Sequence, residues 1–62
     1  MNTHKRHFAI CIDNTDYAAS LIVKKLYEVL PDEEAAKDGF IRIIDESGED
    51  YLYHGSQFVL IE

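Results

Sequence analysis

Short apolar runs alternate with polar clusters along the chain, and each run has the length of a strand. Residues 8–12 place Phe8, Ile10 and Ile12 on one face of an extended segment, with small residues between them. The polar residues 13–16 follow, and they indicate a turn because Asn and Asp side chains bond nearby backbone amides. We therefore expect a first strand over residues 8–12 that ends in a turn.

Residues 17–30 support two interpretations. Apolar residues recur there at helical spacing, namely Ala18, Leu21, Ile22, Leu26 and Val29. Thr15 or Asp16 would cap such a helix at its start. As a strand, the segment instead places Tyr27 and Val29 on one face, and Pro31 ends it. Both interpretations stay open, and residue propensity slightly favours the helix.

The second half of the chain predicts a short helix and three strands. Residues 32–38 have the composition of one or two helical turns, and Gly39 follows at a C-cap position. Residues 40–44 are rich in β-branched side chains, which favour a strand. The remaining predicted elements are a hairpin connection over residues 45–50 with Gly48 at positive φ, a returning strand over 51–53, and a last strand over 58–61.

Charge divides the chain into two unlike parts. The 62 residues contain 6 Lys and Arg against 12 Asp and Glu, a net charge of −6. The first 25 residues carry four basic and two acidic groups, whereas the rest carries two basic and ten acidic groups. A chain of this length predicts a single domain over residues 1–62, with residues 1–6 as a flexible N-terminal arm. The acidity argues against direct binding to nucleic acid, which depends on Lys and Arg contacts to phosphate.

The compartment follows from the cysteine count and from the apolar runs. Cys11 is the only cysteine, so no disulfide can form within the chain. The apolar run that ends at Ile12 is too short for a signal peptide or a membrane-spanning helix. We therefore expect a protein of the cytoplasm that does not engage a membrane.

The chain resembles a group of small, uncharacterised bacterial proteins with an SH3-like barrel. The similarity rests on residues 27–34, Gly39, the run Ile-Asp-Glu-Ser-Gly-Glu-Asp-Tyr-Leu-Tyr over 44–53, and Phe58, with further matches at 11–14 and 19–21. Lys24 and His54 stand where this resemblance leads us to expect glycine and proline. The resemblance implies a strand over residues 25–30 and thus a five-stranded barrel, and it carries no activity with it.

We therefore predict an all-β fold, a small five-stranded SH3-like barrel. Its expected core is Phe8, Ile10, Ile12, Tyr27, Val29, Ile41, Ile43, Leu52, Phe58 and Leu60. The alternative is an α+β domain, in which one helix over residues 16–30 packs on a four-stranded antiparallel sheet.

No combination of residues predicts catalysis, a cofactor or a metal site. Cys11 lies within a strand with no base placed near it, and no serine has a Gly-x-Ser-x-Gly context. The acidic clusters lack the spacing of a Ca²⁺ loop, so we expect solvated turns there. The chain is therefore predicted not to be an enzyme.

The strongest candidate for a binding surface is aromatic and acidic. Tyr51 and Tyr53 share one face of a predicted strand, and Leu52 points the other way, toward the expected core. The acidic residues of the predicted surface are Asp45, Glu46, Glu49 and Asp50 on the hairpin, with Asp32, Glu33 and Glu34 on the helical turn. We predict that this surface binds a protein partner with a basic surface.

Two alternatives stay open. Rows of carboxylates can imitate the phosphates of nucleic acid, which would make the chain an inhibitor of a DNA- or RNA-binding protein, of the kind that phages or mobile elements use against host defences. Exposed strand edges on so small a domain also allow a structural subunit of a homo-oligomer, such as a homodimer.

Overall fold

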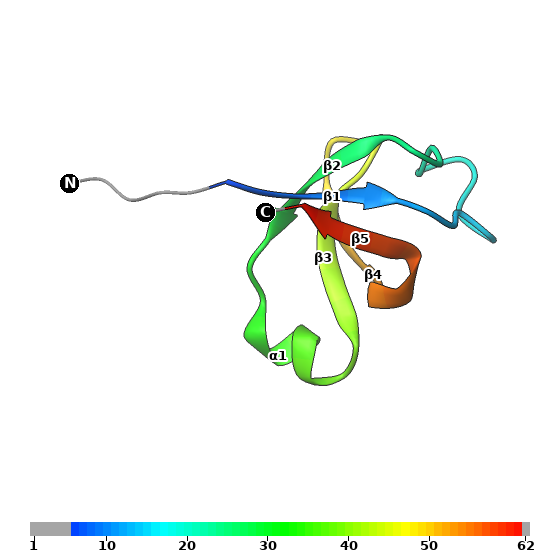
Figure 1. Ribbon diagram of the computed structural model, residues 1–62. Coiled ribbons are helices and arrows are strands. Elements are labelled where there is room, and N and C mark those ends of the chain that lie inside the picture. Colours follow the sequence, from blue (N-terminus) through cyan, green and yellow to red (C-terminus); the bar gives the residue numbers. More distant parts are fainter. Residues whose placement is uncertain (1–5, 62) are drawn as a thin grey trace.

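The apolar runs form the strands of one antiparallel sheet. The computed structural model describes residues 6–61, and its strands are β1 (His7–Cys11), β2 (Leu26–Leu30), β3 (Phe40–Ile44), β4 (Asp50–His54) and β5 (Phe58–Ile61). They follow the order β4-β3-β2-β1-β5, so β4 and β5 are the edge strands (Figure 1). A helix α1 (Glu33–Lys37) connects β2 to β3, and a 3₁₀ turn η1 (Gly55–Gln57) connects β4 to β5. The fold is therefore mostly β, as predicted.

The helix that the alternative fold placed over residues 16–30 is wrong. Residues 26–30 are β2, and residues 12–25 form a loop that contains several turns. A helix would need Leu26 on its buried face, but that side chain is 49% exposed. The strand instead buries Tyr27 opposite Ala9 of β1, and the Tyr27 hydroxyl accepts a hydrogen bond from the amide of Ile22. The burial of this one ring decides between the two interpretations.

The predicted glycine after the helix and the predicted glycine turn are present, and the structure adds an N-cap that was not predicted. Asp32 is the N-cap of α1, and its carboxylate accepts the amide of Ala35 at 3.0 Å. Gly39 follows the helix with φ of 81°, and Gly48 in the β3–β4 connection has φ of 85°. The chain therefore reverses at these two points at little steric cost.

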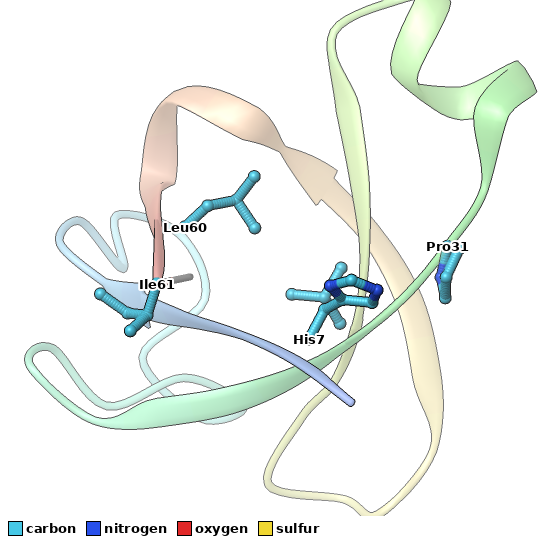
Figure 2. A pocket seen from close by; sticks show the side chains of 5 residues that line it. His7, Pro31, Leu60 and Ile61 are labelled. Carbon is cyan, nitrogen blue, oxygen red and sulfur yellow. The ribbon is translucent and has the colours of Figure 1, made fainter. Parts of the chain in front are cut away.

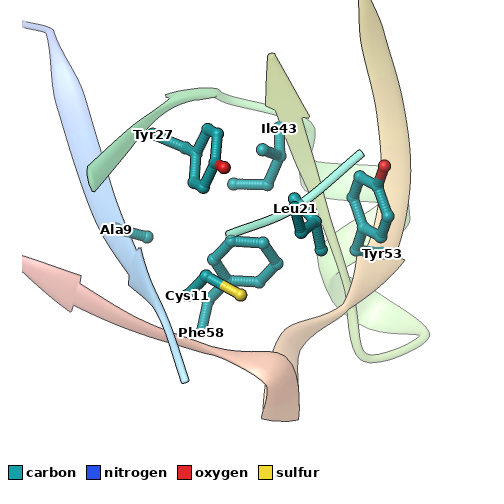
Figure 3. Packing of buried hydrophobic residues seen from close by; sticks show 7 residues of the cluster. All are labelled: Ala9, Cys11, Leu21, Tyr27, Ile43, Tyr53 and Phe58. Atoms are coloured by element: carbon teal, nitrogen blue, oxygen red, sulfur yellow. The ribbon is translucent and has the colours of Figure 1, made fainter. Parts of the chain in front are cut away.

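The core is small and combines three aromatic rings with small and aliphatic side chains. Its buried members are Ala9, Cys11, Leu21, Tyr27, Ile43, Tyr53 and Phe58 (Figure 3). The register sets small residues against large ones, since Ala9 lies opposite Tyr27 and Cys11 lies opposite Phe58. The rings thus occupy the space that the small side chains of β1 leave.

The predicted core is correct in part. Tyr27, Ile43 and Phe58 are buried, and Val29 and Ile41 pack against the cluster. Phe8 and Ile10 are only half-buried, and three further members of the predicted core are exposed: Ile12 at 51%, Leu52 at 42% and Leu60 at 54%.

The reason differs between the strands. β1 turns its small residues inward, because the rings opposite them fill the interior, so Ile12 belongs to the outer face. β4 buries Tyr53 in place of its neighbour Leu52. Leu60 shares the inner face with Ala9, but it lies on an edge strand where no described element covers it.

No helix of residues 6–61 is long and apolar enough to cross a membrane. The predicted flexible arm, residues 1–6, lies outside the described residues except for Arg6.

Lys24 adopts a backbone conformation that favours glycine. Its φ is 75°, in the left-handed region, and its amide donates to the carbonyl of Cys11 at 2.7 Å. The position is where the resemblance to the bacterial group led us to expect glycine. Any side chain with a Cβ atom is sterically disfavoured here.

We predict that Lys24→Gly raises the free energy of unfolding by about 1 kcal/mol, because glycine adopts this φ without strain. Urea denaturation followed by circular dichroism measures the change. Lys24→Ala is the matched control, since it removes the same charge and keeps the Cβ atom, and it should bring no gain. Equal stabilisation by glycine and alanine would mean that the lysine charge, and not the backbone, is responsible.

Candidate functional site

Two residues of the predicted binding surface are buried. Tyr53 is 4% exposed and Asp45 is 6% exposed, and the Tyr53 hydroxyl donates to the Asp45 carboxylate at 2.6 Å. The other carboxylate oxygen of Asp45 accepts the amide and the hydroxyl of Ser47, at 2.9 and 2.6 Å. The structure therefore places Tyr53 and Asp45 in the interior and not on the surface where they were predicted. The Tyr53 ring is part of the core, and its buried hydroxyl requires a hydrogen-bond acceptor, which Asp45 provides.

The buried carboxylate stays charged. Burial by itself raises the pKa of Asp45, but the hydrogen bonds from Ser47 and Tyr53 outweigh burial and hold the pKa below its usual value. For the Tyr53 hydroxyl, burial and the bond to Asp45 both raise the pKa. The Ser20 hydroxyl lies 3.0 Å from that of Tyr53, so the network also reaches the β1–β2 loop.

Three further predicted residues serve ion pairs within the fold. Arg42 lies between Asp32 and Asp50, with a nitrogen 2.9 Å from a carboxylate oxygen of each. The Ala35 amide and Arg42 lower the pKa of Asp32. Glu46 pairs with Lys25 and also accepts the Tyr27 hydroxyl at 2.6 Å, and these two contacts lower its pKa.

The other members of the predicted surface stay exposed. Tyr51 is 51% exposed, and its hydroxyl donates to Glu49 at 3.0 Å, which raises the pKa of Tyr51. Glu33 is exposed on α1, and a carboxylate oxygen of Glu34 lies 3.9 Å from Nζ of Lys37. The structure thus leaves Tyr51 and Glu49 as one small aromatic and acidic patch, and Arg42 brings the neighbouring Asp50 together with Asp32 at the start of α1.

A polar pocket of about 240 Å³ lies between the β1–β2 loop and η1. It is lined by Asp13, Thr15, Asp16, Tyr17, His54, Ser56 and Gln57. Buried Gln57 holds the two walls together, because its amide nitrogen donates to the carbonyl of Asp13 at 3.0 Å and its amide oxygen accepts the amide of His54 at 3.2 Å. The pocket is therefore built by residues 44 positions apart in the chain.

Tyr17 forms the aromatic wall of this pocket. Its side chain is 38% exposed, and its ring packs edge-on against Tyr53 with the centroids 4.9 Å apart. The hydroxyl of Tyr53 is hydrogen-bonded to Asp45 and Ser20, and these bonds fix the ring against which Tyr17 packs. An exposed ring with a fixed support offers contact area at little cost in conformational entropy.

Two carboxylates contribute negative charge to the pocket. One oxygen of Asp13 accepts the hydroxyl and the amide of Thr15, at 2.6 and 2.9 Å, and these bonds lower the pKa of Asp13. Within residues 6–61, the second oxygen of Asp13 accepts no hydrogen bond, and neither Asp13 nor Asp16 forms an ion pair. Asp16 also has φ of 71°, a conformation that Asp tolerates better than most residues do. The pocket can therefore accept a cationic side chain.

Sequence reasoning assigned these pocket residues to other roles. Residues 13–16 were interpreted as a turn, and Tyr17 was the start of an ambiguous segment. The available signal was an aromatic residue directly after a turn with two aspartates. His54 and Ser56 could not be connected to it, because only the folded chain brings η1 beside the β1–β2 loop.

The described residues include no cluster of metal-ligating side chains, and their one cysteine is buried. No group of three or more His, Cys, Asp or Glu side chains in residues 6–61 is arranged to hold a metal ion. Cys11 is fully buried, and its sulfur lies 3.6 Å from the carbonyl oxygen of Asp13. What the polar pocket offers chemically is charge and an aromatic surface.

Comparisons of the chain with protein-family models, with curated proteins and with solved structures found no match.

We predict that Tyr53→Phe lowers the free energy of unfolding by about 1–3 kcal/mol at neutral pH, because buried Asp45 loses one of its donors. Since the folded pKa of Asp45 is lowered, its stabilising effect is complete above the unfolded pKa of about 4 and is lost as the pH falls through the folded pKa. The difference in the free energy of unfolding between the variant and the wild type should therefore become smaller as the pH is lowered. Urea denaturation at a series of pH values measures it.

Tyr51→Phe is the matched control for this prediction. It removes the equivalent hydroxyl from the exposed pair with Glu49, and we expect a nearly unchanged stability at every pH. A gap for Tyr53→Phe that stays constant below pH 4 would contradict the role given to the Asp45 carboxylate.

Proposed function

We propose that this chain is a non-catalytic protein-binding module of the cytoplasm, which binds a basic segment of a protein partner in the polar pocket. The observation that carries the proposal is the pocket itself, in which two carboxylates without a cationic partner in residues 6–61 stand beside the exposed ring of Tyr17. Like the surface predicted from the sequence, the pocket combines an aromatic ring with carboxylates, but it is built by different residues.

Each wall of the pocket has its own part in binding. The second oxygen of Asp13 and the carboxylate of Asp16 attract a Lys or Arg side chain of the partner and orient it. The face of Tyr17 covers the apolar stem of that side chain, and it favours a cation above the ring. Thr15 and Ser56 supply neutral hydroxyls at the rim. A single basic side chain with its flanking backbone fits this combination.

The finer description of the fold that we propose is the SH3-like barrel. The five short antiparallel strands, their order and the 3₁₀ turn before the last strand are consistent with it. In such barrels, aromatic residues beside acidic loops generally form peptide-binding sites. This supports the choice of the β1–β2 loop as the binding loop.

Imitation of nucleic acid is the weaker candidate. It needs a row of carboxylates open to a basic cleft, and the distribution of ion pairs reduces their number. Arg42 pairs with Asp32 and Asp50 and balances one of their two negative charges, and Lys25 pairs with Glu46. We therefore favour a partner that supplies one or two basic side chains over a long basic cleft.

We predict that a synthetic peptide of six residues with two central arginines perturbs the amide NMR signals of residues 13–17 and 54–57 of ¹⁵N-labelled protein. Asp16→Asn should weaken its binding about fivefold, because it removes one carboxylate and keeps a side chain that tolerates the positive φ. Binding should also weaken as salt is added.

Tyr17→Ala and Tyr51→Ala, tested with the same peptide, form a matched pair, since both remove an exposed tyrosine ring. We expect Tyr17→Ala to weaken binding at least as much as Asp16→Asn, and Tyr51→Ala to have little effect. A larger loss with Tyr51→Ala would overturn the pocket and restore the surface of Tyr51 and Glu49. A peptide with citrulline in place of arginine should not bind.

A further inference from the structure

The free edge of β5 is apolar on both faces. The strand has the sequence Phe-Val-Leu-Ile, and three of its side chains are about half exposed: Val59 at 48%, Leu60 at 54% and Ile61 at 44%. Among the residues that the structure describes, β5 pairs with β1 alone. Natural proteins protect such edges with charges, Pro or bulges, and β5 has none of these within Phe58–Ile61. Apolar residues on both faces are typical of a strand whose two faces are covered.

The backbone groups that β5 offers are centred on Leu60. The amide of Ile12 donates to the carbonyl of Gln57, and the ladder bonds of an antiparallel pair alternate along the strand. Val59 and Ile61 therefore direct their amides and carbonyls toward β1, and Leu60 directs its own toward the free edge. The amide of Phe58 is already bonded to the carbonyl of Gly55. Leu60 is thus the residue where a further strand would pair.

A strand centred on Leu60 is complementary to itself. In an antiparallel pairing about a two-fold axis, Leu60 meets Leu60 of the second copy, and Val59 meets Ile61. The Leu60 pair lies on the inner face, and the β-branched pairs lie on the outer face beside Phe8 and Ile10 of β1. The two sheets then continue into one.

The surroundings of the edge favour a second copy for two reasons. The strand carries no charge with which to select a charged partner, and the carboxylates of the β3–β4 connection lie at the opposite end of the strand order. Leu60 and Ile61 also line an open, mainly apolar pocket of about 220 Å³ with His7, Val29 and Pro31, which extends the uncovered surface inward from the edge (Figure 2).

We propose that β5 is the interface of a homodimer, in which two copies of the chain pair their β5 strands antiparallel about Leu60. This inference does not depend on the polar pocket, because that pocket lies beyond the other end of β1, next to Asp13. The dimer leaves both polar pockets open.

Sedimentation equilibrium of the full chain over micromolar to millimolar concentrations tests the dimer. We expect the mass to rise from 7.1 kDa to twice that value. Added salt should strengthen association, because it screens the repulsion between two copies of charge −6. Salt should instead weaken the binding of a basic partner to the polar pocket. The two proposals can therefore be tested and rejected independently of each other. A wild type that stays monomeric at millimolar concentration overturns the dimer, and it leaves β5 open to a strand of another protein.

Leu60→Lys and Leu52→Lys form the matched pair of variants. Both introduce a lysine at a half-exposed leucine of an edge strand, the first on β5 and the second on β4. Leu60→Lys should weaken the dimer about tenfold or more, and Leu52→Lys should leave it unchanged. An equal effect of the two variants overturns the choice of β5. In a mixture of ¹³C-labelled and unlabelled copies, a filtered nuclear Overhauser effect between the two Leu60 side chains is the direct signature.

Discussion

The Tyr53 hydroxyl links the β3–β4 hairpin to the β1–β2 loop, because it donates to the Asp45 carboxylate and also contacts the Ser20 hydroxyl. A chain of 62 residues encloses a small interior, and the rings of Tyr27, Tyr53 and Phe58 lie in it. Such rings bring hydroxyls into the core, and each needs an acceptor there. Asp45 accepts from Tyr53, and the contact with Ser20 extends the same network to the β1–β2 loop. The β1–β2 loop is therefore held by the same tyrosine that fills part of the core.

The charge layout follows from this use of carboxylates in the structure. Asp45 serves the core, Asp32 and Asp50 share Arg42, and Glu46 holds Lys25 and Tyr27. The net charge is strongly negative, but several carboxylates of the acidic run around the hairpin form pairs within the fold. Asp13 and Asp16 stand in the part of the chain with the lower acidic content, and they keep carboxylate oxygens open for a partner. Local pairing, and not the count of acidic residues, decides where a partner can bind.

The sequence predicted what depends on neighbours in the chain and failed where distant residues compete. The strands β3 and β5 have the predicted bounds, because apolar runs with β-branched residues that follow a glycine or a glycine-containing turn are a local signal. The inner face of β1 was assigned by size, and it is reversed because Tyr27 and Phe58 lie opposite Ala9 and Cys11. That competition for volume appears only after the strands have paired. Strand β4 is a second example, because it buries Tyr53 and exposes the more hydrophobic Leu52. The Asp45 carboxylate accepts the Tyr53 hydroxyl in the interior, and this distant acceptor could not be assigned from the sequence.

Strand β1 separates two surfaces that obey different physics. Strand β1 pairs with the uncharged edge strand β5. The association of two copies that we propose at this edge removes apolar side chains from water, and it does not need attraction between charges. Just beyond β1, Asp13 lines the polar pocket, where the binding that we propose rests on attraction between opposite charges and weakens with salt. The proposed dimer edge and the proposed binding pocket thus both border one short strand. Because salt is expected to strengthen the first association and to weaken the second, ionic strength would shift the balance between the two.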